Sequence, residues 1–98
     1  MTDINAQELK ERIEKGEDLN IIDVREQYEY EEYNIGAQLI PLGDLPSKVD
    51  DLDDWQNEEV IVHCKSGARS AAAKAFLVQN GFTNVRNLIG GILAYKAL

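Results

Sequence analysis

The run Val60-Ile61-Val62-His63 constrains the fold of this chain more than any other segment. It is almost continuously apolar and β-branched, which is typical of a strand that is buried on both faces. Strands of this kind occur in parallel sheets that have helices packed against each side. A helix is predicted next, over residues 69–80, with Gly81 as a stop signal just past its end. The segment therefore predicts an α/β protein.

The rest of the chain continues this alternation of strands and helices. Asn5 stands in a capping position and predicts a short amphipathic helix over residues 6–15. The other predicted elements are strands at 19–24, 37–40 and 84–87, one or two helical turns at 26–32, a loop or short helix at 43–49, and a final helix at 92–98. We therefore expect one domain over residues 1–98: a small doubly wound, mostly parallel sheet of about four to five strands, with helices on both faces.

Charge is divided unevenly along the chain. Residues 1–59 contain all 18 carboxylates and five bases, a net charge of -13, whereas residues 60–98 contain five bases and no carboxylate, a net charge of +5. The total of -8 argues against a protein that coats nucleic acid or an anionic membrane, but it permits an anion site in the basic part. No apolar run reaches the length of a transmembrane helix, and no signal-peptide pattern is visible.

Cys64 is the single cysteine, which excludes an intramolecular disulfide and any zinc site built from several cysteines. His63 lies at the wrong spacing to complete such a site, so we expect no zinc site of this kind. A free thiol without a secretion signal fits a reducing cytoplasm. The acidic run at 50–54 lacks the glycine and glutamate of a calcium loop and predicts a solvated loop.

Cys64 opens a basic loop between the buried strand and the helix that follows it. Its sequence is Cys64-Lys65-Ser66-Gly67-Ala68-Arg69-Ser70. A tight curl would turn successive backbone N–H groups inward to form an anion site, and ligands of parallel sheets bind at this end of the strands. The helix N-terminus, Lys65 and Arg69 would favour the thiolate and hold the pKa of Cys64 below about 8.5. A nucleophile within an anion-binding loop predicts an active site, and a buried structural cysteine is the alternative.

Four motifs, in order, resemble the single-domain rhodaneses, a sulfurtransferase family. The Cys64–Ser70 loop resembles the family's signature loop, and Asp23-Val24-Arg25-Glu26 resembles a strand end of the same family. The other two matches are Gly36-Ala37 followed by Ile40-Pro41, and Asn87-Leu88-Ile89-Gly90-Gly91-Ile92 before the last helix. Two positions depart from the family pattern: Glu32-Tyr33-Asn34 replaces Gly-His-Ile, and Tyr95 replaces a tryptophan.

The resemblance implies that Cys64 takes a sulfane sulfur from a small anionic donor such as thiosulfate. The resulting persulfide would pass its sulfur to cyanide or to a thiol or protein acceptor, and the resemblance implies that no metal or organic cofactor is required. Lys65, Ser66, Gly67, Ala68, Arg69 and Ser70 would bind the substrate, and Gly67 would permit the curl. Asp23 and Arg25 would support the site, with Arg25 paired to Asp23 or Glu29. His63 is expected to be a packed or surface histidine, because adjacent strand residues point to opposite faces.

Several alternatives stay open at this point. A cysteine phosphatase of the same fold needs five residues between its cysteine and arginine, whereas Arg69 arrives one residue early. An arsenate reductase would need further thiols from elsewhere. A non-catalytic interaction module or a partner-specific sulfur carrier is also compatible with the fold, with the acidic residues 1–59 as a docking face. The short acidic chain favours a monomer.

Overall fold

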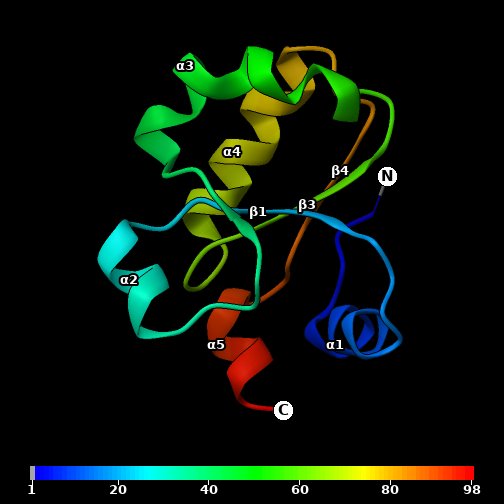
Figure 1. Cartoon of the computed structure of the whole chain (residues 1–98), viewed down its shortest axis with the longest axis vertical. Coiled ribbons are helices and arrows are strands. Elements are labelled where there is room, and N and C mark those ends of the chain that lie inside the picture. The colour runs from blue at the N-terminus through cyan, green and yellow to red at the C-terminus, as the bar shows by residue number, and fades with distance from the viewer. Residues whose placement is uncertain (1) are drawn as a thin grey trace.

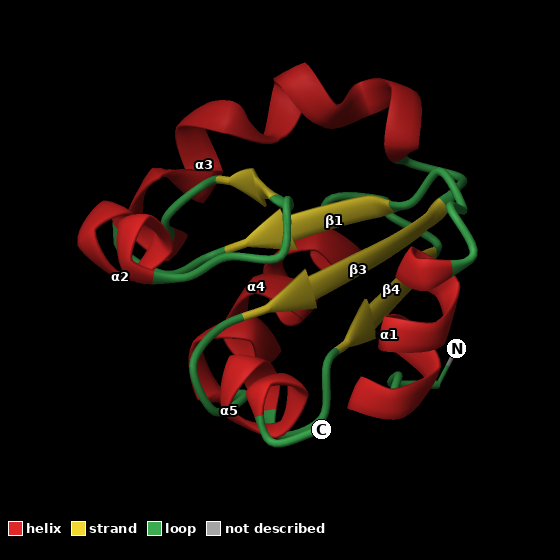
Figure 2. Cartoon of the chain, turned by 60° about the horizontal axis from the view of Figure 1, so that its bottom comes forward, coloured by secondary structure: helices red, strands yellow, loops and turns green. Residues whose placement is uncertain are grey.

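Within residues 2–98, which the structure describes, four strands form one parallel sheet in the order β2-β1-β3-β4. This computed structural model places β3 (Glu59–His63) between β1 (Asn20–Asp23) and β4 (Asn84–Asn87), with the short β2 (Gln38–Leu39) at one edge (Figure 2). The register pairs Asn20 with Val60 and Asp23 with His63. The carboxyl ends of the two inner strands therefore lie side by side, where ligands of such sheets bind.

Helices cover both faces of the sheet, as a doubly wound fold requires (Figure 1). On one side lie α4 (Ala68–Gln79), α3 (Leu45–Lys48) and the 3₁₀ segments η1 (Leu42–Asp44) and η2 (Val49–Trp55). On the other side lie α1 (Ala6–Glu14) and α5 (Gly91–Lys96), while α2 (Gln27–Glu32) follows β1 at the edge. Among the described residues, no helix is both long and apolar enough to cross a membrane.

The sheet separates two hydrophobic clusters, and the alternation along β3 explains why. Val60 and Val62 pack on the side of α4, together with Leu77, whereas Ile61 packs on the side of α1 with Leu9. Each of these side chains is fully buried. A strand that packs against helices on both faces needs apolar side chains at successive positions, which explains the continuous apolar run in β3. The prediction of a parallel sheet with helices on both faces is confirmed.

The main differences from the predicted elements lie at their ends and in the acidic segment. Asn5 does cap α1, since its side chain accepts a 2.8 Å hydrogen bond from the backbone N–H of Glu8. The acidic run predicted to be a loop is instead part of the 3₁₀ segment η2. Its aspartates are exposed as expected, but Leu52 is buried in the core, which gives the segment a reason to be ordered. The last helix ends at Lys96 rather than at residue 98.

Candidate active site

A left-handed glycine forms the curl between β3 and α4. Gly67 has a φ of +117° and precedes the first residue of α4, and its carbonyl accepts a hydrogen bond from the N–H of Ala71. A side chain at this φ would be strained, which is why glycine suits the position. The turn brings the first N–H groups of the helix back toward the end of β3. The predicted concave loop is therefore present in the structure.

Cys64 lies at the centre of this curl. Its side chain is 1% exposed, and its Sγ accepts hydrogen bonds from the N–H of Gly67 at 3.1 Å and the N–H of Ser70 at 3.3 Å. Burial alone would raise the pKa of the Cys64 thiol, but hydrogen bonds from Ser70, Gly67 and Ser66 outweigh burial and hold it below its ordinary value. The predicted direction of the pKa shift agrees with this result. Of the causes expected from the sequence, the N–H groups of the loop contribute here, together with the Ser70 hydroxyl.

The hydroxyl of Ser70 joins the loop to the neighbouring strand. Ser70 is completely buried in the first turn of α4, and its Oγ lies 3.3 Å from Cys64 Sγ. The same Oγ lies 2.6 Å from Oδ1 of Asn87, the last residue of β4. Asn87 also donates from Nδ2 to the carbonyl of Gly67 at 3.2 Å. Asn87 is not among the site residues predicted from the sequence, although it stands at the carboxyl end of a predicted strand.

Arg69 of the basic loop forms an ion pair with a carboxylate from another element of the fold. Arg69 donates from both terminal nitrogens to Glu29 of α2, at 2.7 and 2.9 Å. Arg69 holds the pKa of Glu29 at about 2, although burial acts in the opposite direction. The positive charge that the sequence places at Arg69 is therefore balanced by a carboxylate 40 positions earlier in the chain. Lys65, by contrast, has no carboxylate partner within residues 2–98 and lines the pocket described below.

Asp23 and Arg25 form a buried ion pair at the end of β1. Arg25 Nη2 lies 2.8 Å from Asp23 Oδ2, and both side chains are almost completely buried. Arg25 also donates to the carbonyls of Glu29 at 3.4 Å and Tyr33 at 2.8 Å, at the end of α2. Neither residue touches Cys64 in the hydrogen bonds of the site. The pair instead fixes the position of α2, the helix that presents Glu29 to Arg69.

His63 lies beside Asp23 of the neighbouring strand, although it precedes Cys64 in sequence. Its Nε2 lies 3.6 Å from Asp23 Oδ2, and neither ring nitrogen has a hydrogen-bond partner among the described residues. Burial and the positive charge of Arg25 lower the pKa of His63, and they outweigh the attraction of Asp23. The imidazole is therefore a packed, neutral group at neutral pH, as the strand alternation predicts.

The first turn of α5 closes the loop from the opposite side. The N–H groups of Ile92 and Leu93 donate to the carbonyls of Cys64 and Lys65 at 2.9 and 3.1 Å. Gly91 permits this approach, since a Cβ at that position would lie 2.4 Å from the carbonyl oxygen of Lys65. With these carbonyls bound to α5, the N–H groups of the loop are free to face the sulfur.

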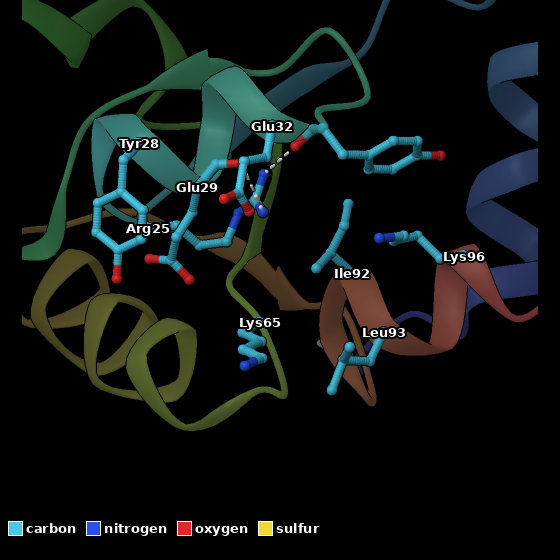
Figure 3. A pocket seen from close by; sticks show the side chains of 9 residues that line it. Arg25, Tyr28, Glu29, Glu32, Lys65, Ile92, Leu93 and Lys96 are labelled. Carbon is cyan, nitrogen blue, oxygen red and sulfur yellow. Dashed lines mark hydrogen bonds between the residues drawn. The ribbon is translucent and has the colours of Figure 1, made fainter.

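A pocket of about 230 Å³ opens beside the loop. Tyr28, Glu29 and Glu32 of α2 form one wall, Leu93 and other α5 residues form the opposite wall, and Lys65 lies between them (Figure 3). The other lining residues are Arg25, Tyr33, Ile92 and Lys96. Cys64 is not among the lining residues, because its side chain is buried beneath the loop, whereas its neighbour Lys65 is part of the lining.

Comparison with known proteins agrees with the geometry. Residues 5–98 match the rhodanese-like domain family. The chain is 39% identical to YtwF of Bacillus subtilis, provisionally named a sulfurtransferase, over 96% of this chain and 89% of that protein. It is 32% identical to a sulfurtransferase of Allochromatium vinosum, over 97% and 88% of the two chains. It is also 36% identical to YrkF of B. subtilis, provisionally named a sulfur carrier protein, but spans only 48% of that protein.

Solved structures give the same result. The fold superposes on SSP1007 of Staphylococcus saprophyticus with a TM-score of 0.82 at 38% identity, covering 97% of this chain and 93% of that one. A rhodanese-related protein of Thermoplasma volcanium gives a TM-score of 0.84 at 34% identity, covering 99% and 92% of the two chains. The family match, the similarity to sulfurtransferases and the shared fold lead to one conclusion: this chain belongs to the rhodanese-like sulfurtransferase and sulfur-carrier family.

Proposed function

We propose that this protein transfers sulfane sulfur through a persulfide on Cys64. The Cys64 thiolate attacks the outer sulfur of an anionic donor such as thiosulfate. A new S–S bond forms, the S–S bond of the donor breaks, and its electron pair leaves with sulfite. A thiol, a sulfur-accepting protein or cyanide then attacks the outer sulfur of the persulfide. The S–S bond of the persulfide breaks, and its electron pair returns to Sγ of Cys64. No redox partner is needed, because each step exchanges one S–S bond for another bond to sulfur.

The observation that carries this proposal is the set of hydrogen-bond donors around Sγ. The N–H groups of Gly67 and Ser70 are already directed at the sulfur before any substrate is present. Preorganised donors stabilise charge that develops in a reaction without having to reorganise. Sγ carries negative charge as the thiolate nucleophile and gains it again as the leaving group. The donors therefore favour the reactive thiolate before the first half of the reaction and stabilise the leaving thiolate in the second half.

The charges at the pocket support an anionic donor. Lys65 lines the pocket without a carboxylate partner among the described residues, so it is available to bind thiosulfate. Arg69 is held by Glu29, and we propose that it acts on the donor less than Lys65 does. Backbone N–H groups from Ser66 to Ser70 would complete the anion site, with Asp23 and Arg25 as supports through α2.

The same ion pair argues against a phosphatase. Such an enzyme requires an arginine that can bind two oxygens of a phosphate, and the guanidinium of Arg69 already binds two oxygens of Glu29. The loop between Cys64 and Arg69 is also one residue too short for that role. A site for a single sulfur atom fits these constraints better than a site for a tetrahedral phosphate.

Mass spectrometry of the intact protein after incubation with thiosulfate tests the proposal. We expect the mass to rise by one sulfur atom, the gain to disappear on addition of cyanide, and Cys64→Ser to show no gain. Hydrolysis of an aryl phosphate without sulfur uptake would instead support a phosphatase. Uptake of sulfur only from a protein persulfide would identify a partner-specific carrier, and no uptake from any donor would support a binding module. For localisation and assembly, we propose a monomer in a reducing cytoplasm.

A further inference from the structure

The hydroxyl of Ser70 faces more acceptors than it has protons. A serine hydroxyl donates one proton and offers two lone pairs. Three acceptors lie within reach of Ser70 Oγ: Asn87 Oδ1 at 2.6 Å, the Gly67 carbonyl oxygen at 3.2 Å, and Cys64 Sγ at 3.3 Å. The shortest of these distances lies at the short end of the range for O–H···O bonds. In this arrangement the proton therefore lies toward Asn87 and not toward the cysteine.

The orientation of the Asn87 amide is fixed by the loop itself. Its Nδ2 donates to the carbonyl of Gly67 at 3.2 Å. If the amide were turned over, its oxygen would face that carbonyl oxygen, and two acceptors would meet with no proton between them. Oδ1 must therefore face Ser70, as an acceptor.

Because the site is buried, the hydroxyl proton of Ser70 can form a hydrogen bond only with the protein acceptors around it. Ser70 is completely buried and Cys64 is 1% exposed, so bulk water does not replace a hydrogen bond that either group loses. In such surroundings a hydrogen bond to a charged sulfur is strong, and so is the competition for the proton that makes it.

We propose that Asn87 is a positioning residue for sulfur transfer, whose amide oxygen competes with the Cys64 sulfur for the hydroxyl proton of Ser70. This inference deepens the function proposed above and rests on it. With a neutral thiol, the Cys64 S–H donates to Ser70 Oγ, which donates in turn to Asn87. With a thiolate, the Ser70 hydroxyl rotates toward Sγ and leaves Asn87.

The same proton would then alternate during one catalytic cycle. In the persulfide the negative charge lies on the outer sulfur, so Sγ is a weak acceptor and the Ser70 proton returns to Asn87. When an acceptor attacks the outer sulfur, the S–S bond breaks and its electron pair moves to Sγ. The hydroxyl then turns back and stabilises the leaving thiolate. Asn87 Oδ1 thus accepts the Ser70 proton whenever Sγ carries no negative charge. A substitution at Asn87 therefore alters the ionisation of Cys64 through Ser70.

A double-mutant cycle tests this inference without any sulfur transfer, through the pH dependence of Cys64 alkylation by iodoacetamide. Asn87→Leu removes the competing acceptor, so we expect the midpoint to fall by at least about half a pH unit. Ser70→Ala removes the donor, so the midpoint should rise. In the Ser70→Ala background, Asn87→Leu should leave the midpoint unchanged, because its effect passes through the missing hydroxyl.

Two results would overturn the proposal. One is an equal shift on Asn87→Leu with and without the Ser70 hydroxyl, which would assign Asn87 to loop structure alone. The other is a rise in the midpoint on Asn87→Leu. The surrounding charged and titratable groups are the same in every variant, so they do not produce the difference. They are His63, Lys65, Arg69, Glu29 and Asp3, whose carboxylate accepts a 3.0 Å hydrogen bond from the backbone N–H of Asn87. Asn84→Leu, at the other end of β4, is the matched control and should not move the midpoint.

A measurement on the unaltered protein covers the case in which Asn87→Leu does not fold. The ¹³Cγ chemical shift of Asn87 should change with pH at the midpoint of Cys64 ionisation, because Oδ1 loses its proton donor there. The change should vanish in Ser70→Ala. A shift that does not follow the ionisation of Cys64 would contradict the proposal. Since neither measurement requires a sulfur donor, failure here is distinct from failure of the proposed function.

Discussion

Gly91 is the residue at which one added methyl group would disturb the site most. An alanine Cβ there would lie 2.4 Å from the Lys65 carbonyl oxygen and 2.7 Å from the Cys64 carbonyl oxygen, at a φ of +61°. We expect Gly91→Ala to lower the free energy of unfolding by about 3 kcal/mol, from strain and overpacking together. Sulfur uptake should also fall, because α5 would no longer bind the loop carbonyls. Urea denaturation measures the first effect and intact mass the second.

Gly36 provides the matched control for this substitution. It has a similar φ of +83°, but a Cβ there would meet nothing within 4 Å. Gly36→Ala should therefore cost only the backbone strain, about 1 kcal/mol, and leave sulfur uptake intact. Equal losses in the two variants would show that the close approach of Gly91 to the loop does not matter.

The residues of the site that sequence could identify are those that are neighbours in the chain. Cys64 and its loop lie together, so the turn chemistry and the thiol are visible at once. The contacts of Glu29 with Arg69 and of Asn87 with Ser70 were not predicted, because they join residues 40 and 17 positions apart, through α2 and the end of β4. The position of Asn87 at a strand end was the one available signal, and polar residues there are common enough that it was not decisive.

At the scale of elements, the pair Glu29–Arg69 links α2 to the first turn of α4. Both oxygens of Glu29 are bound, and its side chain is only 12% exposed, so the pair is better placed than an ordinary surface ion pair. We expect Glu29→Gln and Arg69→Gln each to lower the free energy of unfolding by about 1 kcal/mol. The double variant should lose less than the sum, with a coupling of roughly 1 kcal/mol. Additive losses, measured by chemical denaturation, would show that the two helices are not coupled here.

The elements themselves were predictable to different degrees. The buried strand β3 and the long helix α4 have strong patterns, because each must satisfy a fixed periodicity over several residues. The segment η2 was missed because its order depends on Leu52, one apolar side chain among four aspartates, which contacts a core that the local sequence does not show. The short β2 is defined by its pairing with β1, which again is a tertiary property.

At the scale of the molecule, stability should fall on acidification in two separate pH ranges. The pKa of His63 is lowered from 6.5 in the folded protein, so below that pH the unfolded chain binds a proton that the folded chain does not. The contribution of His63 to the free energy of unfolding is therefore fully present above about pH 6.5, and it decreases as the pH falls below that value. Hydrogen bonds from Arg69 and Arg12 hold the pKa values of Glu29 and Glu59, respectively, at about 2. The stability that these carboxylates contribute is lost as the pH falls from 4.5 toward that value.

Replacing His63 by leucine tests whether this residue causes the loss of stability in the upper of the two pH ranges. His63→Leu should flatten the free energy of unfolding between pH 6.5 and 5 and leave the steeper loss below pH 4.5. Because both ring nitrogens lack hydrogen bonds within the described residues, the variant should not lose stability at neutral pH. Denaturation at a series of pH values measures both effects. An unchanged slope between pH 6.5 and 5 would assign that range to other groups.

The hydrogen bonds from α5 to the loop carbonyls set an order of events during biosynthesis. Chains are made and begin to fold from the N-terminus, so the Cys64 loop is synthesised before Ile92 and Leu93, which bind the carbonyls of Cys64 and Lys65. Until that last turn is in place, the peptide groups that must face the sulfur are free to turn elsewhere. The nascent chain therefore holds an ordinary thiol, and the lowered pKa of Cys64 arises only in the finished fold.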